Sequence, residues 1–154
     1  EACIAYTQHG SWGRYRQRMI NKIKNKCKIP INVVINDTYA AGSTSCSRAK
    51  VCFQPPHPLT IHWSRFLRAW HQGTLPVVVN PDGWYKEESF IKNYRDILDQ
   101  NNKSCLLVNE SDMDKAMKDL ADQDFVQEKL LNIQKLDLSD YNASKTWEKL
   151  YNIL

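Results

Sequence analysis

The chain has 154 residues, the size of one ordinary domain, and its 42% hydrophobic and 25% charged residues are typical of globular proteins. No run of 18 or more apolar residues is present, which excludes a membrane-spanning helix. Charge is divided unevenly: residues 1–77 carry eleven Lys or Arg and two acids, whereas residues 78–154 carry ten and fifteen. The basic first half favours an anionic ligand, such as a nucleotide diphosphate or a nucleic-acid backbone, or an acidic face of the same protein.

Short apolar runs alternate with helical periodicity along the whole chain. In chain order, the pattern predicts a strand at 3–6, a helix at 14–26, strands at 30–35 and 49–53, a helix at 60–72 and a strand at 75–79. A helix at 90–100, a strand at 105–108 and helices at 111–120, 124–136 and 143–153 follow. Gly73 is placed to end the helix at 60–72 as a left-handed cap. This alternation predicts one α/β domain over residues 1–154, doubly wound around a parallel sheet.

Ligands of doubly wound proteins bind beyond the carboxyl ends of the strands, so the loops there are the candidate sites. The first of these loops, at 9–14, contains Gly10, Trp12, Gly13 and Arg14 and opens a helix that also carries Arg16. Backbone amides and arginines at a helix N-terminus can bind a phosphate. The alternative interpretation is a tight turn with solvated arginines.

The stretch 55–70 holds the densest group of candidate ligands. His62, Arg65 and Arg68 are spaced three residues apart at the start of the predicted helix, so they share a face. Together with His57 in the preceding proline-rich turn, they could bind a diphosphate, arginine by its fork geometry and histidine by a hydrogen bond or a proton. The alternative is that these cations form ion pairs with the acidic second half.

Residues 47–56, Arg65 and the segment 73–77 resemble the donor-domain signature of exostosin-like glycosyltransferases and the related spore-maturation type. Nine positions separate Pro56 from Arg65, eight separate Arg65 from Gly73, and three separate Gly73 from Pro76. That spacing is similar to the family's Ser, strand ending in Pro, Arg and Gly-x-x-Pro-Val. The flanking segments agree as well, so the similarity spans nearly the whole chain.

The resemblance implies one Rossmann-like half of a two-domain GT-B fold, the half that binds a nucleoside diphosphate sugar as donor substrate. A separate acceptor domain would supply the general base, and the acceptor would be a hydroxyl of a glycan, a protein or a lipid. Gly10, Trp12, Arg14, His57, His62, Arg65 and Arg68 are the donor-binding candidates, without a metal or another cofactor. The family usually has Glu three residues after the motif Arg, where this chain has Arg68, and this implies either a different donor or lost turnover.

Two other functions fit the same sequence. A polyanion-binding or nucleic-acid-binding module would use the basic half with Trp12, Tyr15, Trp63 and Trp70 as stacking platforms. A non-catalytic relic of a donor domain would act as an interaction protein. Five cysteines without a two-residue spacing favour reduced thiols and a cytoplasmic location, whereas four Asn-x-Ser/Thr sequons point to the lumen of the secretory pathway.

Overall fold

The computed structural model describes residues 1–6, 13–35, 48–54, 63–80 and 103–139. They form one parallel sheet of five strands in the order β2-β1-β3-β4-β5. The strands are β1 (Ala2–Tyr6), β2 (Ile31–Ile35), β3 (Val51–Gln54), β4 (Leu75–Asn80) and β5 (Leu106–Asn109). All five predicted strands are confirmed to within two residues at each end. The predicted fold class, an α/β Rossmann-like domain with a parallel sheet, is confirmed too.

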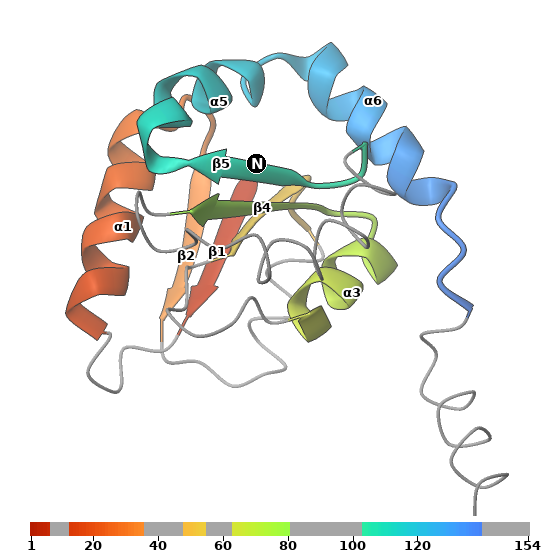
Figure 1. Cartoon of the computed structure of the whole chain (residues 1–154), viewed down its shortest axis with the longest axis horizontal. Coiled ribbons are helices and arrows are strands. Elements are labelled where there is room, and N and C mark those ends of the chain that lie inside the picture. The colour runs from red at the N-terminus through yellow and green to blue at the C-terminus, as the bar shows by residue number, and fades with distance from the viewer. Residues whose placement is uncertain (7–12, 36–47, 55–62, 81–102, 140–154) are drawn as a thin grey trace, which may run out of the picture.

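Helices cover both faces of this sheet. They are α1 (Gly13–Lys26), α3 (Trp63–His71), the 3-10 turn η1 (Glu110–Asp112), α5 (Met113–Asp119) and α6 (Gln123–Gln134). Contacts join α1 to α5 on one face, and Figure 1 shows α3 on the opposite side of β4 from α5. The helices predicted at 90–100 and 143–153 lie outside the described residues.

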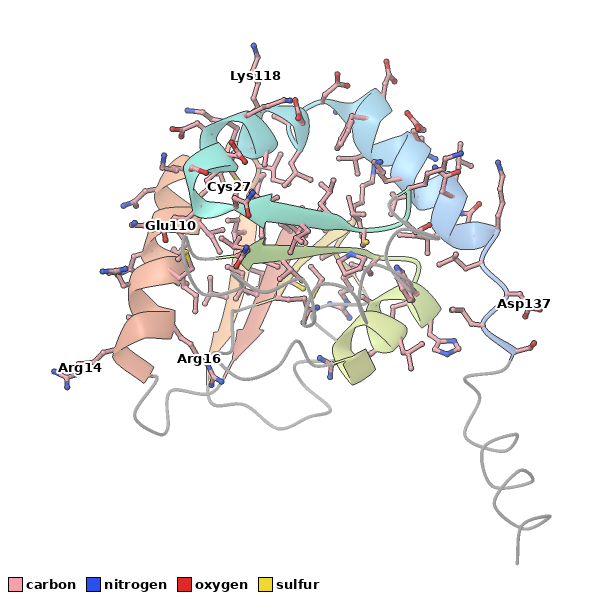
Figure 2. The ribbon with its side chains drawn as sticks, in the orientation of Figure 1. Arg14, Arg16, Cys27, Glu110, Lys118 and Asp137 are labelled. Carbon is pink, nitrogen blue, oxygen red and sulfur yellow. The ribbon has the colours of Figure 1, made fainter. Side chains whose placement is uncertain are left out.

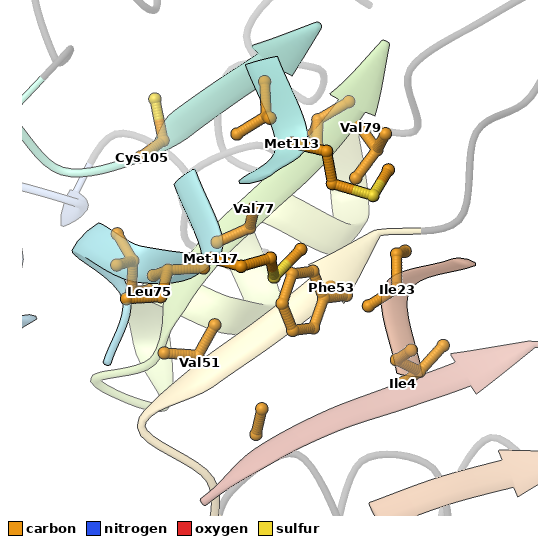
Figure 3. Packing of buried hydrophobic residues seen from close by; sticks show 14 of the residues in the cluster. Ile4, Ile23, Val51, Phe53, Leu75, Val77, Val79, Cys105, Met113 and Met117 are labelled. Carbon is orange, nitrogen blue, oxygen red and sulfur yellow. The ribbon is translucent and has the colours of Figure 1, made fainter. Parts of the chain in front are cut away.

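The core lies between α1, α5 and one face of the sheet. Alternate strand residues enter it, because successive side chains of a strand point to opposite faces. From the helices, Ile23 of α1 and Met113 and Met117 of α5 meet them (Figure 3). Met19 and Ile20 of α1 belong to the same core cluster. The sheet contributes Ala2, Ile4, Val51, Phe53, Leu75, Val77, Val79 and Val108. Buried β-branched residues of this kind are what a parallel sheet covered on both faces requires.

Pro76 lies inside β4, a central strand, although proline lacks the N–H that a sheet ladder uses. Pairing with β5 begins one residue later, at Val77 opposite Leu106. On its other side Pro76 is in register with Cys52 of β3. Proline is accepted here because it precedes the ladder that β4 makes with β5.

A Schellman motif ends α3, and Gly73 is its left-handed cap, as predicted. Gly73 has a φ of +65°, its N–H donates to Trp70 O at 2.9 Å, and the N–H of Thr74 donates to Ala69 O at 2.8 Å. The hydroxyl of Thr74 then donates to Ala49 O at 3.1 Å, next to β3. The turn Gly73-Thr74 therefore fixes the point at which the chain leaves α3 and enters β4.

Candidate functional site

The strand order places a topological switch point between β1 and β3. From β1 the chain runs through α1 to β2 on one side of β1, and from β3 it runs through α3 to β4 on the other side. The two strands are paired in register up to Ile4 and Phe53. In open α/β sheets, ligands bind beyond the carboxyl ends of the strands at such a point. The predicted loops at 9–14 and 55–65 both follow these two strands.

On α1, Arg16 is the arginine that faces the sheet. Positions 16, 19, 20 and 23 form one helical stripe, and the last three are core residues. Arg16 is only 8% exposed, whereas Arg14, two residues earlier and so on the opposite side of the helix, is exposed. Figure 2 shows Arg14 pointing away from the sheet and Arg16 pointing toward the ends of β1 and β2. Arg16 is therefore the cation that α1 brings to the carboxyl edge.

The second predicted group starts on α3. Arg65 lies in the first turn of this helix, where the structure describes its backbone, and Arg68 follows one turn later with a half-buried side chain. Because α1 and α3 cover opposite faces of the sheet and Arg14 points outward, the structure does not bring Arg14 toward these two arginines. The other candidates, Gly10, Trp12, His57 and His62, lie outside the described residues.

The first turns of the helices differ in charge. α1 and α3, which follow the two switch-point strands, have no acidic residue in their first turns. α5 and α6 do, with Asp114 and Asp124, and Asp122 caps α6 by accepting from the N–H of Asp124 at 2.9 Å. Acidic side chains stabilise a helix N-terminus, so their absence leaves the positive ends of α1 and α3 available to an anionic ligand.

Carboxamides end three adjacent strands on the face opposite the core, and the sequence interpretation did not include them. They are Gln54 on β3, Asn80 on β4 and Asn109 on β5. Asn80 and Asn109 are in register, and Gln54 is in register with Val78, two residues before Asn80. We call these three residues the carboxamide row. The sequence shows a polar residue at the end of each of these apolar strands, but only the strand order makes the three residues neighbours.

Within this row, Nε2 of Gln54 donates to Sγ of Cys52 at 3.4 Å, whereas Asn80 and Asn109 are hydrogen-bonded in sequence. Nδ2 of Asn80 donates to Oδ1 of Asn109 at 3.0 Å, and Nδ2 of Asn109 donates to a carboxylate oxygen of Asp112 at 3.4 Å. Within the described part of the chain, Oδ1 of Asn80 is buried without a hydrogen-bond partner. A buried acceptor left in that state costs about 1–3 kcal/mol, so Asn80 calls for an explanation.

Part of the positive charge of the first half is paired with the second half. Lys22 on α1 forms an ion pair with Glu110 of η1, and Lys26, one turn later, pairs with Asp114 of α5 at 2.7 Å. These pairs join α1 to η1 and to α5. The sequence left open that the cations at 62–68 form ion pairs with the acidic second half. In the structure, two lysines of α1 form ion pairs with that half.

A hollow of about 300 Å³ lies beside β5, away from the switch point. Leu106, Leu107 and Phe125 line it together with charged residues of α5, and it reaches Asn109 and Asp112 at its polar end. No described cation other than Lys115 lines it. This hollow therefore suits an apolar group better than a phosphate.

Together, these features define a doubly wound α/β protein with a cationic switch point and a neutral carboxamide row beside it. No protein-family model matches the chain, and no curated protein matches it. None of the helices in the described ranges is both long and apolar enough to cross a membrane.

Proposed function

We propose that this chain is the donor-binding domain of a glycosyltransferase and binds a nucleoside diphosphate sugar at the carboxyl ends of β1 and β3. The observation that carries the proposal is the switch point itself. The two connections that leave it, each a loop followed by the first turn of a helix, carry the donor-binding candidates Gly10, Trp12, His57, His62 and Arg65. An acceptor domain would complete the enzyme and supply the general base.

Arg16 supports a diphosphate as the ligand. At 8% exposure the Arg16 guanidinium lies in a site with little water, where a charge-assisted hydrogen bond to an anion is stronger than at an open surface. Its planar fork matches two phosphate oxygens at once, which a lysine ammonium cannot do. Arg65 and Arg68 on α3 would approach the same diphosphate from the other side of the sheet.

The two helix N-termini support the same ligand. α1 and α3 have 14 and 9 residues, long enough for their aligned peptide dipoles to act at the first turn. Neither first turn contains an acid. In a transfer reaction, these positive ends and the arginines would stabilise the departing diphosphate as its negative charge develops.

The test is thermal stability of the chain with a panel of nucleoside diphosphates and nucleotide sugars. A ligand at 100 times its Kd stabilises the folded state by about 2.7 kcal/mol, which is about 5–10 °C in Tm for a domain of this size. Arg16→Met and Arg65→Ala should each abolish the shift. Lys24→Ala removes an exposed cation from the last turn of α1 and should retain it.

Each other outcome has a defined meaning. If no nucleotide raises Tm but a nucleic-acid oligomer does, and that effect falls steeply with salt, the chain is a polyanion-binding module instead. Trp70 could not serve as its stacking platform, because the ring is 4% exposed. If a nucleotide sugar binds and no acceptor domain restores transfer, the domain is a relic that keeps the donor site alone.

A further inference from the structure

The carboxamide row contains a buried hydrogen-bond acceptor whose orientation is fixed by its neighbours. The side chains of Asn109 and Asp112 are exposed, and because a carboxylate accepts hydrogen bonds, their contact turns Nδ2 of Asn109 toward Asp112 and its Oδ1 toward Asn80. Asn80 must then present Nδ2 to Asn109, which leaves its own Oδ1 as the acceptor without a partner in the described residues. Turning the Asn80 amide over would place two oxygens face to face. The orientation of Oδ1 of Asn80 therefore follows from the two hydrogen bonds that link Asn80, Asn109 and Asp112.

Burial and position show what this acceptor suits. Asn80 is 7% exposed and Gln54 is 6% exposed, and both end strands at the edge where ligands of this fold bind. Neither carries a charge, in contrast to Arg16 and the α3 arginines. A neutral acceptor whose orientation is set by a neighbour selects ligands that carry an uncharged O–H or N–H donor. A ligand without that donor leaves the acceptor unpaired and binds more weakly.

We propose that Oδ1 of Asn80 accepts a hydrogen bond from an uncharged donor of the bound ligand, with Asn109 and Asp112 as positioning residues. This inference rests on the proposed function. The group that donates the hydrogen bond is then a hydroxyl of the transferred sugar or an imide N–H of the nucleotide base. The arginines would bind the diphosphate, and the carboxamide row would select the uncharged part attached to it. Asn80 is then a specificity residue that the resemblance does not include.

The experiment compares Asn80→Leu with the wild type by calorimetric titration. Uridine and guanosine diphosphates are titrated first, followed by their glucose, N-acetylglucosamine and mannose esters. Leucine has a similar size and no polar atom, so the variant removes the hydrogen bond without opening a cavity. The expected result is an affinity about 10- to 100-fold weaker. Asn25→Leu, on the exposed side of α1, is the matched control and should bind as the wild type does.

The panel of ligands distinguishes the two groups that could donate this hydrogen bond. A loss confined to the nucleotide sugars assigns the hydrogen-bond donor to a hydroxyl of the transferred sugar, whereas an equal loss for the diphosphates assigns it to the nucleoside. Unchanged affinity for all of them overturns the inference and leaves the proposed function intact. A large fall in the Tm of Asn80→Leu together with unchanged affinity would show that Asn80 has only a structural role, through its hydrogen bond to Asn109.

A second measurement separates the inference from the proposed function. The side-chain amide resonances of Asn80 and Asn109 are followed by nitrogen-15 NMR in the wild-type chain, with each nucleotide and with free glucose, mannose and N-acetylglucosamine. If no nucleotide binds but a free sugar shifts the Asn80 amide, the donor-domain function fails and the inference stands. If none of these ligands shifts it, the inference is wrong.

Discussion

Lys22 on α1 and Glu110 of η1 form an ion pair between positions 88 residues apart in the sequence. The next helical turn repeats the contact with Lys26 and Asp114. The glutamate side chain is only 16% exposed, whereas the side chain of Asp114 is 78% exposed. The first pair is therefore less screened by water than the second; it holds α1 against η1, and the second holds α1 against α5.

We expect a double-mutant cycle of Lys22→Met and Glu110→Gln to give a coupling energy of about 1 kcal/mol in urea unfolding. The cycle of Lys26→Met and Asp114→Asn is the matched control, with an expected coupling below about 0.5 kcal/mol because an exposed pair is screened. Equal couplings in the two cycles would show that burial of Glu110 does not strengthen its ion pair.

Gly73→Ala should destabilise the chain by about 1–2 kcal/mol, measured as the free energy of unfolding in urea. A Cβ at Gly73 would meet no atom within 4 Å, so the φ of +65° is the whole cause. Gly73→Asn should cost less, since asparagine adopts the left-handed region more readily than alanine. If alanine and asparagine cost the same, backbone strain is not the reason for glycine here.

Trp70→Phe should lower the free energy of unfolding by about 1–3 kcal/mol. The indole Nε1 donates to the carbonyl of Ser104 at 2.8 Å, and both residues are buried, so phenylalanine leaves that oxygen unpaired. Leu67→Met, a volume-conserving change on the same helix, is the control and should cost less than about 1.5 kcal/mol. A Trp70→Phe cost no larger than the control's would show that water replaces the lost donor.

Burial raises the pKa of the Cys27 thiol, against smaller lowering effects from backbone hydrogen bonds and the N-terminal charge. The folded chain therefore keeps this proton to higher pH than the unfolded chain does. The stability it contributes is fully present below the unfolded pKa and is lost as pH rises through the folded pKa. We expect iodoacetamide to alkylate Cys27 more slowly in the native chain than in urea at pH 8.5, as followed by peptide mass spectrometry. A native rate equal to the rate in urea would contradict the raised pKa.

The sequence predicted the sheet well because its strands are continuous apolar runs and its breaks are glycine, proline and asparagine. Gly73 is the sharpest case, since only the left-handed cap explains a glycine between Trp70 and the run at 75–79. Helix boundaries were less certain: the predicted start at Ser111 is a 3-10 turn, and α5 begins at Met113 without a side-chain cap. Neither the apolar pattern nor the serine distinguishes these two kinds of turn.

The candidate site was only partly predictable. The period of α1 places Arg16 on the stripe of Met19, Ile20 and Ile23, so the sequence already predicts its burial, although the donor-binding candidates include Arg14 and not Arg16. The carboxamide row could not be assembled in the same way. Which strands are neighbours depends on the crossover connections, and without the order β3-β4-β5 nothing relates Gln54 to Asn80 or Asn109.

The position of β1 has a consequence for how the chain folds. The first strand in the sequence lies inside the sheet, with β2 on one side and β3 on the other, and pairs Ala2 with both Ile31 and Val51. Both ladders join distant parts of the chain, which slows the search for the native state. The amide hydrogens of β1 should therefore exchange with solvent only through opening of the whole domain, which makes this strand the natural reporter of its global stability.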